Sequence, residues 1–165
     1  MNFYIFRHGE TYFSKNNLDY NEHVEDAQIL AEGFPALEHL GGFLKNVETD
    51  INISSTYKRC RQTVKIVGRR SEKKFVFEAL LRDWDSRNET VEGTANRITD
   101  FHQQLTANDQ QLKSVCICSH GYPIAMLKSL ILTGKVDLSK LDDYPETGVL
   151  LIIKHGKVEE IDFNS

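Results

Sequence analysis

Two short apolar runs in this chain each end abruptly in a histidine followed by a glycine. The runs cover residues 2–6 and 114–118, and their continuations read Arg7-His8-Gly9 and Ser119-His120-Gly121. Apolar runs of this length predict buried strands. Strands of a parallel sheet carry their ligands beyond their carboxyl ends, so polar side chains at these positions are delivered to an opening of the fold. The pattern therefore predicts an α/β protein with a functional site at one edge of its sheet.

Strands and helices alternate along the chain. We expect strands at 2–6, 50–54, 75–77 and 114–118, helices at 34–44, 58–70, 95–105 and 123–132, loops at 9–26 and 83–92, and a hairpin of residues 148–154 and 158–163. The alternation predicts a three-layer α/β/α sandwich with a mainly parallel central sheet and a C-terminal antiparallel hairpin. Gly41 and Gly42 weaken the first long helix near its end. A chain of 165 residues suits one domain, residues 1–165.

Composition excludes several classes of partner. The formal net charge is -4, without a long basic tract, so a nucleic acid partner is not expected. The chain has no apolar run of the ~18 residues that a membrane span requires, and its N-terminus shows no signal-peptide pattern. The odd number of cysteines, at Cys60, Cys116 and Cys118, predicts reduced thiols in a cytoplasmic protein.

Four loops converge on one edge of the predicted sheet. The loops after the four expected parallel strands carry, in chain order, Arg7-His8, Arg59, Asp83 and His120. The carboxyl ends of parallel strands meet at the same edge. This convergence indicates a shared site more strongly than any one of the motifs does.

The residue types at that edge suit phosphoryl transfer. A phosphoryl group in transfer carries negative charge on its oxygens, and catalysis consists mostly of positioning and charge stabilisation. Arginine donates a planar fork of hydrogen bonds and stays charged, so Arg7 and Arg59 are the candidate phosphate clamps. A neutral imidazole is available near neutral pH, so His8 is the candidate nucleophile and a phosphohistidine the expected intermediate.

The remaining groups complete such a reaction. His120 is expected as a second cationic or hydrogen-bonding group on the phosphoryl oxygens. The leaving alkoxide needs a proton, so a carboxylic acid should face the nucleophile, with Asp83 as first candidate and Asp85 as second. The cationic side chains supply the charge stabilisation, so neither a metal nor another cofactor is expected.

In this order, the motifs resemble the signature of the histidine phosphatase (phosphoglycerate mutase-like) superfamily. The matching strings are residues 6–11 (Phe-Arg-His-Gly-Glu-Thr), residues 30–33, residues 54–63 around Arg59, and Ser119-His120-Gly121. The resemblance implies that Arg7, Arg59, His120 and Gly121 bind the phosphoryl group. The family usually has a glutamate as its acid. Here the local string is Leu81-Arg82-Asp83-Trp84-Asp85, which leaves Asp83 and Asp85 both open.

The resulting expectation is a small cytoplasmic phosphomonoester hydrolase. Its substrate would be a small phosphorylated metabolite or a phosphoprotein. A phosphoglycerate mutase-type phosphotransferase, a phosphohistidine-protein phosphatase and a non-catalytic module that binds phosphorylated ligands remain alternatives. The presence of both histidines and both arginines disfavours the last.

Two features bear on the substrate. Trp84, beside the candidate acid, could pack in the protein or stack on a ligand. Acidic residues of two loops would repel highly anionic substrates if they rim the pocket, and otherwise only keep the surface hydrated. They are Asp19, Glu22, Glu25, Asp26, Asp142, Asp143 and Glu146.

Overall fold

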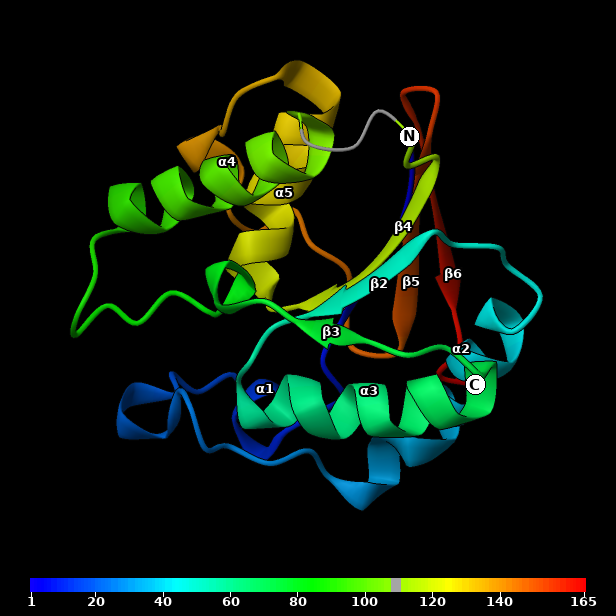
Figure 1. Cartoon of the computed structure of the whole chain (residues 1–165). Coiled ribbons are helices and arrows are strands. Elements are labelled where there is room, and N and C mark those ends of the chain that lie inside the picture. Colours follow the sequence, from blue (N-terminus) through cyan, green and yellow to red (C-terminus); the bar gives the residue numbers. More distant parts are fainter. Residues whose placement is uncertain (108–110) are drawn as a thin grey trace.

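A six-stranded sheet forms the middle layer of the computed structural model, which describes residues 1–107 and 111–165 (Figure 1). The strands lie in the order β3-β2-β4-β1-β5-β6. Their bounds are β1 Asn2–Arg7, β2 Ile51–Ser54, β3 Val76–Phe77, β4 Ser114–Ser119, β5 Val149–Lys154 and β6 Lys157–Asp162. The first four strands pair in parallel, and β5 and β6 join antiparallel beside β1. The predicted parallel sheet with its C-terminal hairpin is confirmed.

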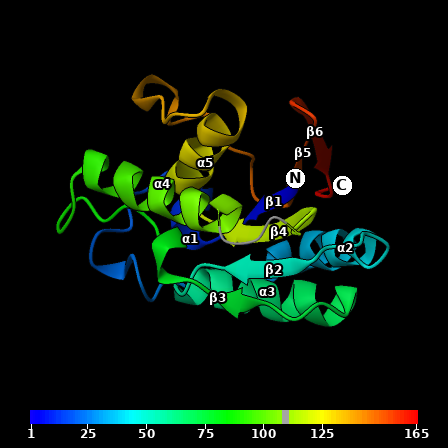
Figure 2. The same ribbon diagram turned by 45° about the horizontal axis from the view of Figure 1, so that its top comes forward.

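Helices cover both faces of this sheet. The α-helices are α1 Tyr12–Lys15, α2 Phe34–Leu44, α3 Lys58–Ser71, α4 Val91–Ala107 and α5 Gly121–Thr133. Single 3₁₀ turns lie at Asn21–His23, Ala31–Gly33, Ala79–Leu81 and Leu138–Lys140. Helices α2 and α3 lie on one face, and α4 and α5 on the other (Figures 1 and 2). The predicted three-layer sandwich is therefore confirmed. None of the described helices is long and apolar enough to cross a membrane.

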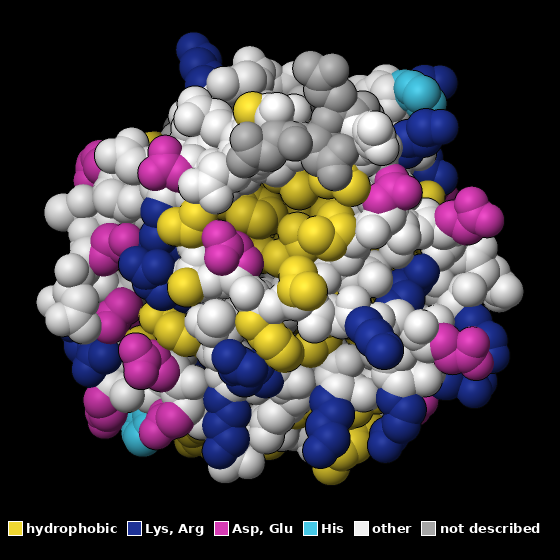
Figure 3. Space-filling view, in the orientation of Figure 1, with side chains coloured by type: hydrophobic (Ala, Val, Ile, Leu, Met, Phe, Trp, Pro, Cys, Tyr) yellow, Lys and Arg dark blue, Asp and Glu magenta, His cyan; other side chains and the backbone are white. Residues whose placement is uncertain are grey.

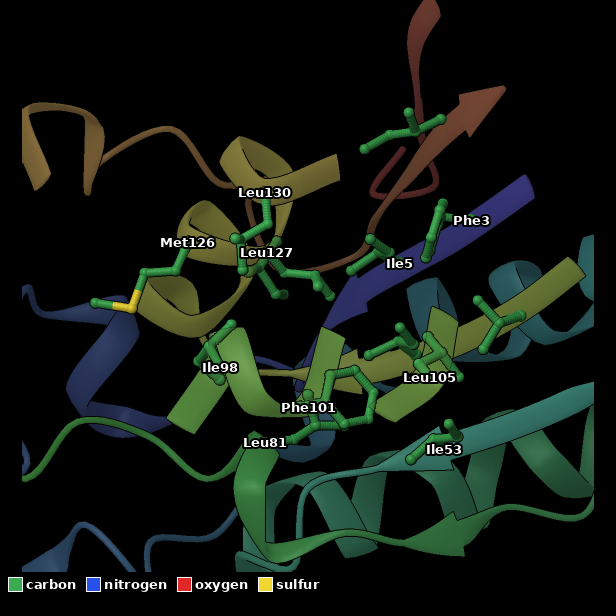
Figure 4. Close-up of a cluster of buried hydrophobic side chains, with 14 of the residues drawn as sticks. Phe3, Ile5, Ile53, Leu81, Ile98, Phe101, Leu105, Met126, Leu127 and Leu130 are labelled. Atoms are coloured by element: carbon green, nitrogen blue, oxygen red, sulfur yellow. The ribbon is translucent and has the colours of Figure 1, made fainter. Parts of the chain in front are cut away.

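Each face of the sheet has its own apolar core. Along β1, Phe3 and Ile5 point toward α4 and α5 (Figure 4), whereas Tyr4 and Phe6 point toward α2 and α3. Alternate side chains of a strand face opposite sides, so a strand covered by helices on both sides must be apolar throughout. Burying an apolar side chain of this size contributes about 2 kcal/mol. The two cores thus hold β1, and the groups that follow it, in a fixed position.

The first loop contains structure that the sequence prediction missed. Helix α1 lies inside the expected loop 9–26, and a capping box begins it. Ser14 N donates to Thr11 Oγ1 at 3.0 Å, and Thr11 N donates to Ser14 Oγ at 2.8 Å. The usual capping box has Glu or Gln at its second position, so a serine there gives a weak signal.

Helix α4 begins four residues before its expected start and shortens the loop 83–92. Its N-terminal cap is Thr90, whose Oγ1 accepts a hydrogen bond from Gly93 N at 3.0 Å. Threonine is a favoured cap, and the glycine three residues later conceals the start of the helical pattern.

The strand register brings the functional loops to one edge. Arg7 of β1 lies opposite Ser119 of β4, and Ser54 of β2 lies opposite both Cys118 and Phe77. The four carboxyl ends are therefore level, as predicted. Figures 1 and 2 show the first loop and the loop before α4 projecting from the same side of the sheet.

Strand β3 is the edge strand at the end of the sheet opposite to β6, and it leaves an apolar surface exposed. Val76 and Phe77 are exposed there, and the Arg61 guanidinium lies 4.1 Å from the Phe77 ring centroid. Figure 3 shows hydrophobic side chains gathered on this face, with Lys and Arg side chains below them. The surface is separate from the edge that carries the functional loops.

Candidate active site

Two buried histidines lie side by side at the ends of β1 and β4. The ring centroids of His8 and His120 are 5.3 Å apart, and only 1% of His8 is exposed. The backbone fixes this spacing, because His8 N donates to Ser119 O at 3.0 Å and continues the parallel pairing of the two strands. The pair that the sequence predicted from two separate strand ends is thus a single structural unit.

Hydrogen bonding determines which nitrogen of His8 is free. His8 Nδ1 lies 2.7 Å from Gly9 O, a carbonyl that can only accept, so Nδ1 carries the proton and Nε2 keeps its lone pair. Gly9 is held in turn, because its N–H donates to Thr63 Oγ1 at 2.8 Å. Burial, then the charges of Arg59 and Arg7, lower the pKa of His8 well below its usual value. His8 is therefore neutral and presents the lone pair of Nε2.

Arg59 is fully buried beneath the first loop. Its Nη1 donates to Val24 O, and its Nη2 donates to Asp83 Oδ2 at 2.8 Å. The guanidinium carbon lies 3.9 Å from the centroid of the Tyr20 ring. A cation over an aromatic face is stabilised by the ring quadrupole. Arg59 is thus buried, whereas the other arginines of α3 are exposed.

His120 is oriented by Ser55, which follows β2. Ser55 Oγ lies 2.7 Å from His120 Nε2, and it also accepts a hydrogen bond from Tyr57 N at 3.3 Å. Among the described residues the Ser55 hydroxyl has no other acceptor, so it donates its proton to Nε2, which leaves the ring proton on Nδ1. Burial, followed by the charges of Arg59 and His8, lowers the pKa of His120 well below its usual value. His120 is thus a neutral hydrogen-bond donor rather than a cation.

Three buried nitrogens in this region lack a hydrogen-bond partner. They are the only such buried side-chain atoms among residues 1–107 and 111–165, namely Arg7 Nε, Arg59 Nε and His120 Nδ1. A buried donor without a partner costs about 1–3 kcal/mol, and native proteins rarely leave one. All three belong to residues predicted to bind a phosphoryl group. An anion with several oxygens is a ligand that suits donors of this kind.

The two candidate acids have different surroundings. Asp83 is buried, and its Oδ2 lies 3.9 Å from His120 Nδ1 as well as against Arg59. Burial raises the pKa of Asp83 above its usual value, although Arg59 opposes this. Asp85 instead pairs with Arg87, at 3.0 Å between Oδ1 and Nε. Hydrogen bonds from Arg87 and Asn88 lower the pKa of Asp85 to about 2. Asp83 is thus the carboxyl that the structure brings to the histidines.

An arginine from α4 fixes the loop that carries Asp83. Arg97 Nη1 donates at 2.7 Å to the carbonyls of Leu80 and Arg82, and Nη2 donates at 3.0 Å to that of Asp83. The same side chain pairs with Glu89 at 2.7 Å. A fully used guanidinium of this kind is a rigid support, because its planar fork can hold several acceptors at once.

A cavity of about 530 Å³ opens above this group. Its lining includes Asp83 and Tyr20, which contact Arg59, and Arg7, whose charge acts on His8. The side chains of His8, Arg59 and His120 are not among the lining residues. Gly121, predicted to bind substrate, lines the cavity. A side chain has no room at this position, because a Cβ would come within 2.8 Å of the Tyr144 ring. Of the predicted acidic rim, Asp19 and Glu146 line the cavity, whereas the other five residues do not.

The structure adds residues that sequence reasoning missed. Ser55 and Thr63 stand in the string around Arg59, where their spacing could have signalled a role. Tyr20 and Arg97 have no local pattern that distinguishes them. Their contribution depends on contacts between segments distant in the sequence, of which the hydrogen bond from Arg97 to Asp83 is one.

Comparison with known proteins identifies the family. A sequence profile of the "Histidine phosphatase superfamily (branch 1)" matches residues 3–88, which is more than half of the chain. The chain belongs to the histidine phosphatase superfamily. A search of curated protein sequences finds no match.

Three solved structures share the fold over at least 97% of this chain. A putative alpha-ribazole-5'-P phosphatase from Escherichia coli has a TM-score of 0.78 at 16% identity, covering 100% of this chain and 96% of its own. A phosphoglycerate mutase from Bacillus anthracis has a TM-score of 0.76 at 19% identity, covering 99% and 93%. A mycobacterial glucosyl-3-phosphoglycerate phosphatase with VO3 has a TM-score of 0.75 at 15% identity, covering 97% and 96%.

The sequence profile covers only part of the site, whereas the structural matches cover all of it. Residues 3–88 include Arg7, His8, Arg59 and Asp83, whereas His120 lies beyond the matched segment. The structural matches extend over β4 and α5, the elements that position His120. The whole fold that brings these residues together is therefore the histidine phosphatase fold.

Proposed function

We propose that this protein hydrolyses phosphate monoesters through a phosphohistidine formed on His8. The observation that carries the proposal is the set of three unpaired buried nitrogens around a neutral histidine whose Nε2 is free. Donors that find no partner in the protein are suited to the oxygens of a phosphoryl group. The alternative of a binding module alone gives no reason for a nucleophile held in the reactive tautomer.

In the first step, His8 Nε2 attacks phosphorus and the bond from phosphorus to the alcohol oxygen breaks. Arg7, Arg59 and the Nδ1–H of His120 donate to the phosphoryl oxygens and stabilise their charge. The proton of Asp83 passes to the leaving oxygen, which departs as the alcohol. Asp83 is the better acid than Asp85, because the low pKa of Asp85 keeps it ionised at neutral pH.

Substrate binding requires Asp83 to move. In the free protein its carboxylate occupies the position beside Arg59 and His120 that the phosphoryl group would take. A phosphate dianion competes for the same donors, with more oxygens and more charge. Displaced from Arg59 and placed beside an anion, the carboxyl gains affinity for a proton. Binding of the substrate would thus raise the pKa of Asp83 and favour its uptake of a proton from solvent.

In the second step, water attacks the phosphohistidine. Asp83, now a carboxylate, takes a proton from the water, the phosphorus–nitrogen bond breaks, and phosphate leaves with His8 neutral again. Transfer to water is favoured over transfer to a second alcohol because exposed residues, such as Asn17, Ser86 and Glu146, form the outer wall of the cavity. The names of two similar structures refer to small phosphorylated compounds, which supports a small metabolite as substrate. Three free, buried cysteines support a reducing, cytoplasmic location.

Hydrolysis of an aryl phosphate tests the proposal. An aryl leaving group needs little protonation, so the test depends on His8 and the phosphate clamps alone. We expect His8→Asn to abolish turnover and His39→Asn, an exposed histidine on α2, to retain it. Equal rates for the wild type and His8→Asn, or no hydrolysis by either, would refute the proposal.

An alkyl phosphate tests the acid. We expect Asp83→Asn to lose turnover of the alkyl ester by at least about a hundredfold, in the range of general acid catalysis, and to lose far less with the aryl ester. Asp85→Asn is the matched control, since Asp85 faces Arg87. Loss of alkyl ester turnover in Asp85→Asn alone would assign the acid to Asp85.

A further inference from the structure

We propose that the cavity selects phosphate monoesters whose alcohol carries a planar aromatic group and no second anionic group. The proposal rests on the proposed function and names the class of substrate for the same site. It is carried by two features of the cavity walls, a series of aromatic side chains and an unbalanced set of charges.

Three aromatic side chains form a continuous series along one side of the cavity. The ring centroids of Trp84 and Tyr122 are 5.6 Å apart, and those of Tyr122 and Tyr144 are 6.1 Å apart, in edge-to-face arrangements. All three rings line the cavity and are only partly buried, so each keeps accessible surface. Rings in mutual edge-to-face contact hold one another in place and offer a rigid surface on which a planar group can pack.

The rings are anchored to different parts of the fold. Trp84 Nε1 donates to Glu89 O at 2.9 Å, which fixes the indole next to Asp83 in the sequence. Tyr122 belongs to α5, next to His120. Tyr144 lies over the position where Gly121 has no side chain, and 5.1 Å separate its ring centroid from the Arg7 guanidinium carbon. The aromatic series thus begins beside a phosphate clamp and passes close to the acid, where the alcohol of a bound ester would lie.

The first loop adds further apolar lining. Phe13, Leu18 and Tyr20 also line the cavity, and the Phe13 and Tyr20 ring centroids are 5.0 Å apart. A planar ring system would cover more of these apolar side chains than a short acid would. The cavity volume of about 530 Å³ falls within the range of small-molecule sites, about 300–1,000 Å³.

The charges of the lining exclude a second anion. Arg7 is the only cation among the described residues that line the cavity, and the phosphoryl group would use it. Asp19 and Glu146 line the outer part and form no ion pair with any described residue. A carboxylate or second phosphate on the substrate would therefore meet carboxylates instead of a guanidinium or ammonium group. Repulsion of this kind is an effective source of selectivity.

A matched set of esters tests the proposal. Benzyl phosphate and cyclohexylmethyl phosphate have alcohols of similar size and similar acidity, but only the first is planar. We expect kcat/KM to be about tenfold higher for benzyl phosphate, the range of one aromatic packing contact, and to be lowest for 3-phosphoglycerate. Equal values for the first two, or a preference for 3-phosphoglycerate, would overturn the proposal. If no ester, the aryl phosphate included, were hydrolysed, the proposed function itself would fail.

Substitutions locate the preference in the cavity. We expect Tyr122→Leu to reduce the ratio of benzyl to cyclohexylmethyl phosphate toward one, because kcat/KM should fall for benzyl phosphate more than for cyclohexylmethyl phosphate. Phe77→Leu, at an exposed aromatic residue on β3 outside the cavity, is the matched control and should leave the ratio unchanged. If Tyr122→Leu fails to fold, Glu146→Lys supplies a second readout, because it should raise kcat/KM for 3-phosphoglycerate several-fold relative to benzyl phosphate. An unchanged ratio in Tyr122→Leu, or no gain in Glu146→Lys, would contradict the assignment.

Discussion

At the scale of the residue, the two histidines hold the same tautomer but present opposite ends to the site. Each carries its proton on Nδ1. His8 directs that proton to Gly9 O and presents the Nε2 lone pair, whereas His120 engages Ser55 through Nε2 and presents the Nδ1 proton. One ring thereby presents a lone pair and the other a hydrogen-bond donor. The difference is set by one carbonyl and one hydroxyl.

Ser55 is therefore expected to act through His120. Ser55→Ala removes the donor to Nε2, so the ring proton can move to Nε2 and turn a lone pair toward the phosphoryl group. We expect kcat/KM to fall by about tenfold, the cost of one misplaced buried donor, with recovery in Ser55→Thr. The His120 tautomer should change in ¹⁵N NMR spectra. Ser54→Ala is the control, because the Ser54 hydroxyl donates to Ser55 O and does not contact His120. An unchanged tautomer and rate in Ser55→Ala would remove Ser55 from the site.

The pKa of Asp83 sets a second expectation. Burial raises this pKa above its usual value, and the proposed acid works only while protonated. The ratio of alkyl to aryl ester kcat/KM should therefore fall as the pH rises through that pKa, because only the alkyl ester needs the proton. The ratio also cancels the titration of the phosphate itself and of His8. In Asp83→Asn the ratio should be low and independent of pH. A wild-type ratio that does not vary with pH would contradict Asp83 as the acid.

At this scale the sequence predicted which residues meet but not how they are oriented. Arg7, His8, Arg59 and His120 could be placed because each follows a strand or begins a helix. The choice of Asp83 over Asp85 was open in the sequence, since both lie in one short loop. It depends on the pairing of Asp85 with Arg87, a side-chain geometry that no periodicity encodes.

At the scale of the element, close packing between α2 and α3 supports the end of α3 opposite to Arg59. Gly41 faces α3 so closely that a Cβ would come within 2.8 Å of the Arg70 Cβ and 3.0 Å of Val67 O. At Gly42, the nearest atom, Arg70 Nε, would be 3.8 Å away. The two glycines that weaken this helix in the sequence therefore have different roles, and only Gly41 is required by packing.

The two positions form a matched pair for substitution by alanine. Gly42→Ala should raise the free energy of unfolding by up to about 1 kcal/mol, because alanine favours the helix. Gly41→Ala has the same local gain but forces backbone or side-chain shifts that cost about 1–3 kcal/mol, so a net loss is expected. Urea unfolding of the two variants and the wild type measures the difference. Equal stabilisation of both would show that α2 can move away from α3.

The elements also show where pattern reading works. Helices α2, α3 and α5 and the strands lie within one or two residues of their predicted ends. Helix α1 and the start of α4 were missed because both depend on single caps, Ser14 with Thr11 and Thr90, within polar sequence. Caps stabilise a helix without contributing to apolar periodicity.

At the scale of the whole molecule, the sheet lies between two cores and carries the buried histidines at the carboxyl ends of its strands. The alternation of strands and helices predicted the layers and the shared edge. It could not give the strand order, because parallel strands are joined by helices and sequence neighbours need not pair. Strand β4, for example, lies between β1 and β2, and β5 pairs with β1.

Burial of the two histidines couples folding to pH. Burial and the nearby arginines lower the pKa of His8 and His120 well below normal, whereas the unfolded chain has the ordinary value of about 6.5. As the pH drops from 7.5 to 5.5 the unfolded state takes up more protons than the folded state, so the free energy of unfolding should fall, by at most about 1.4 kcal/mol per pH unit for each histidine. The raised pKa of Asp83 acts in the opposite direction. Urea unfolding of the wild type and of the double variant His8→Asn/His120→Asn isolates the contribution of the histidines. The same pH dependence in both proteins would show that the histidines do not cause it.

The central claim is that the phosphoryl group is carried on His8. Rapid mixing with an aryl phosphate, quenching in alkali to preserve a phosphorus–nitrogen bond, and peptide mass spectrometry would locate the modification. The account predicts one phosphoryl group on the peptide that contains His8, lost on acid treatment and absent in His8→Asn. A phosphoryl group on another residue, or steady hydrolysis without any phosphorylated intermediate on His8, would contradict it.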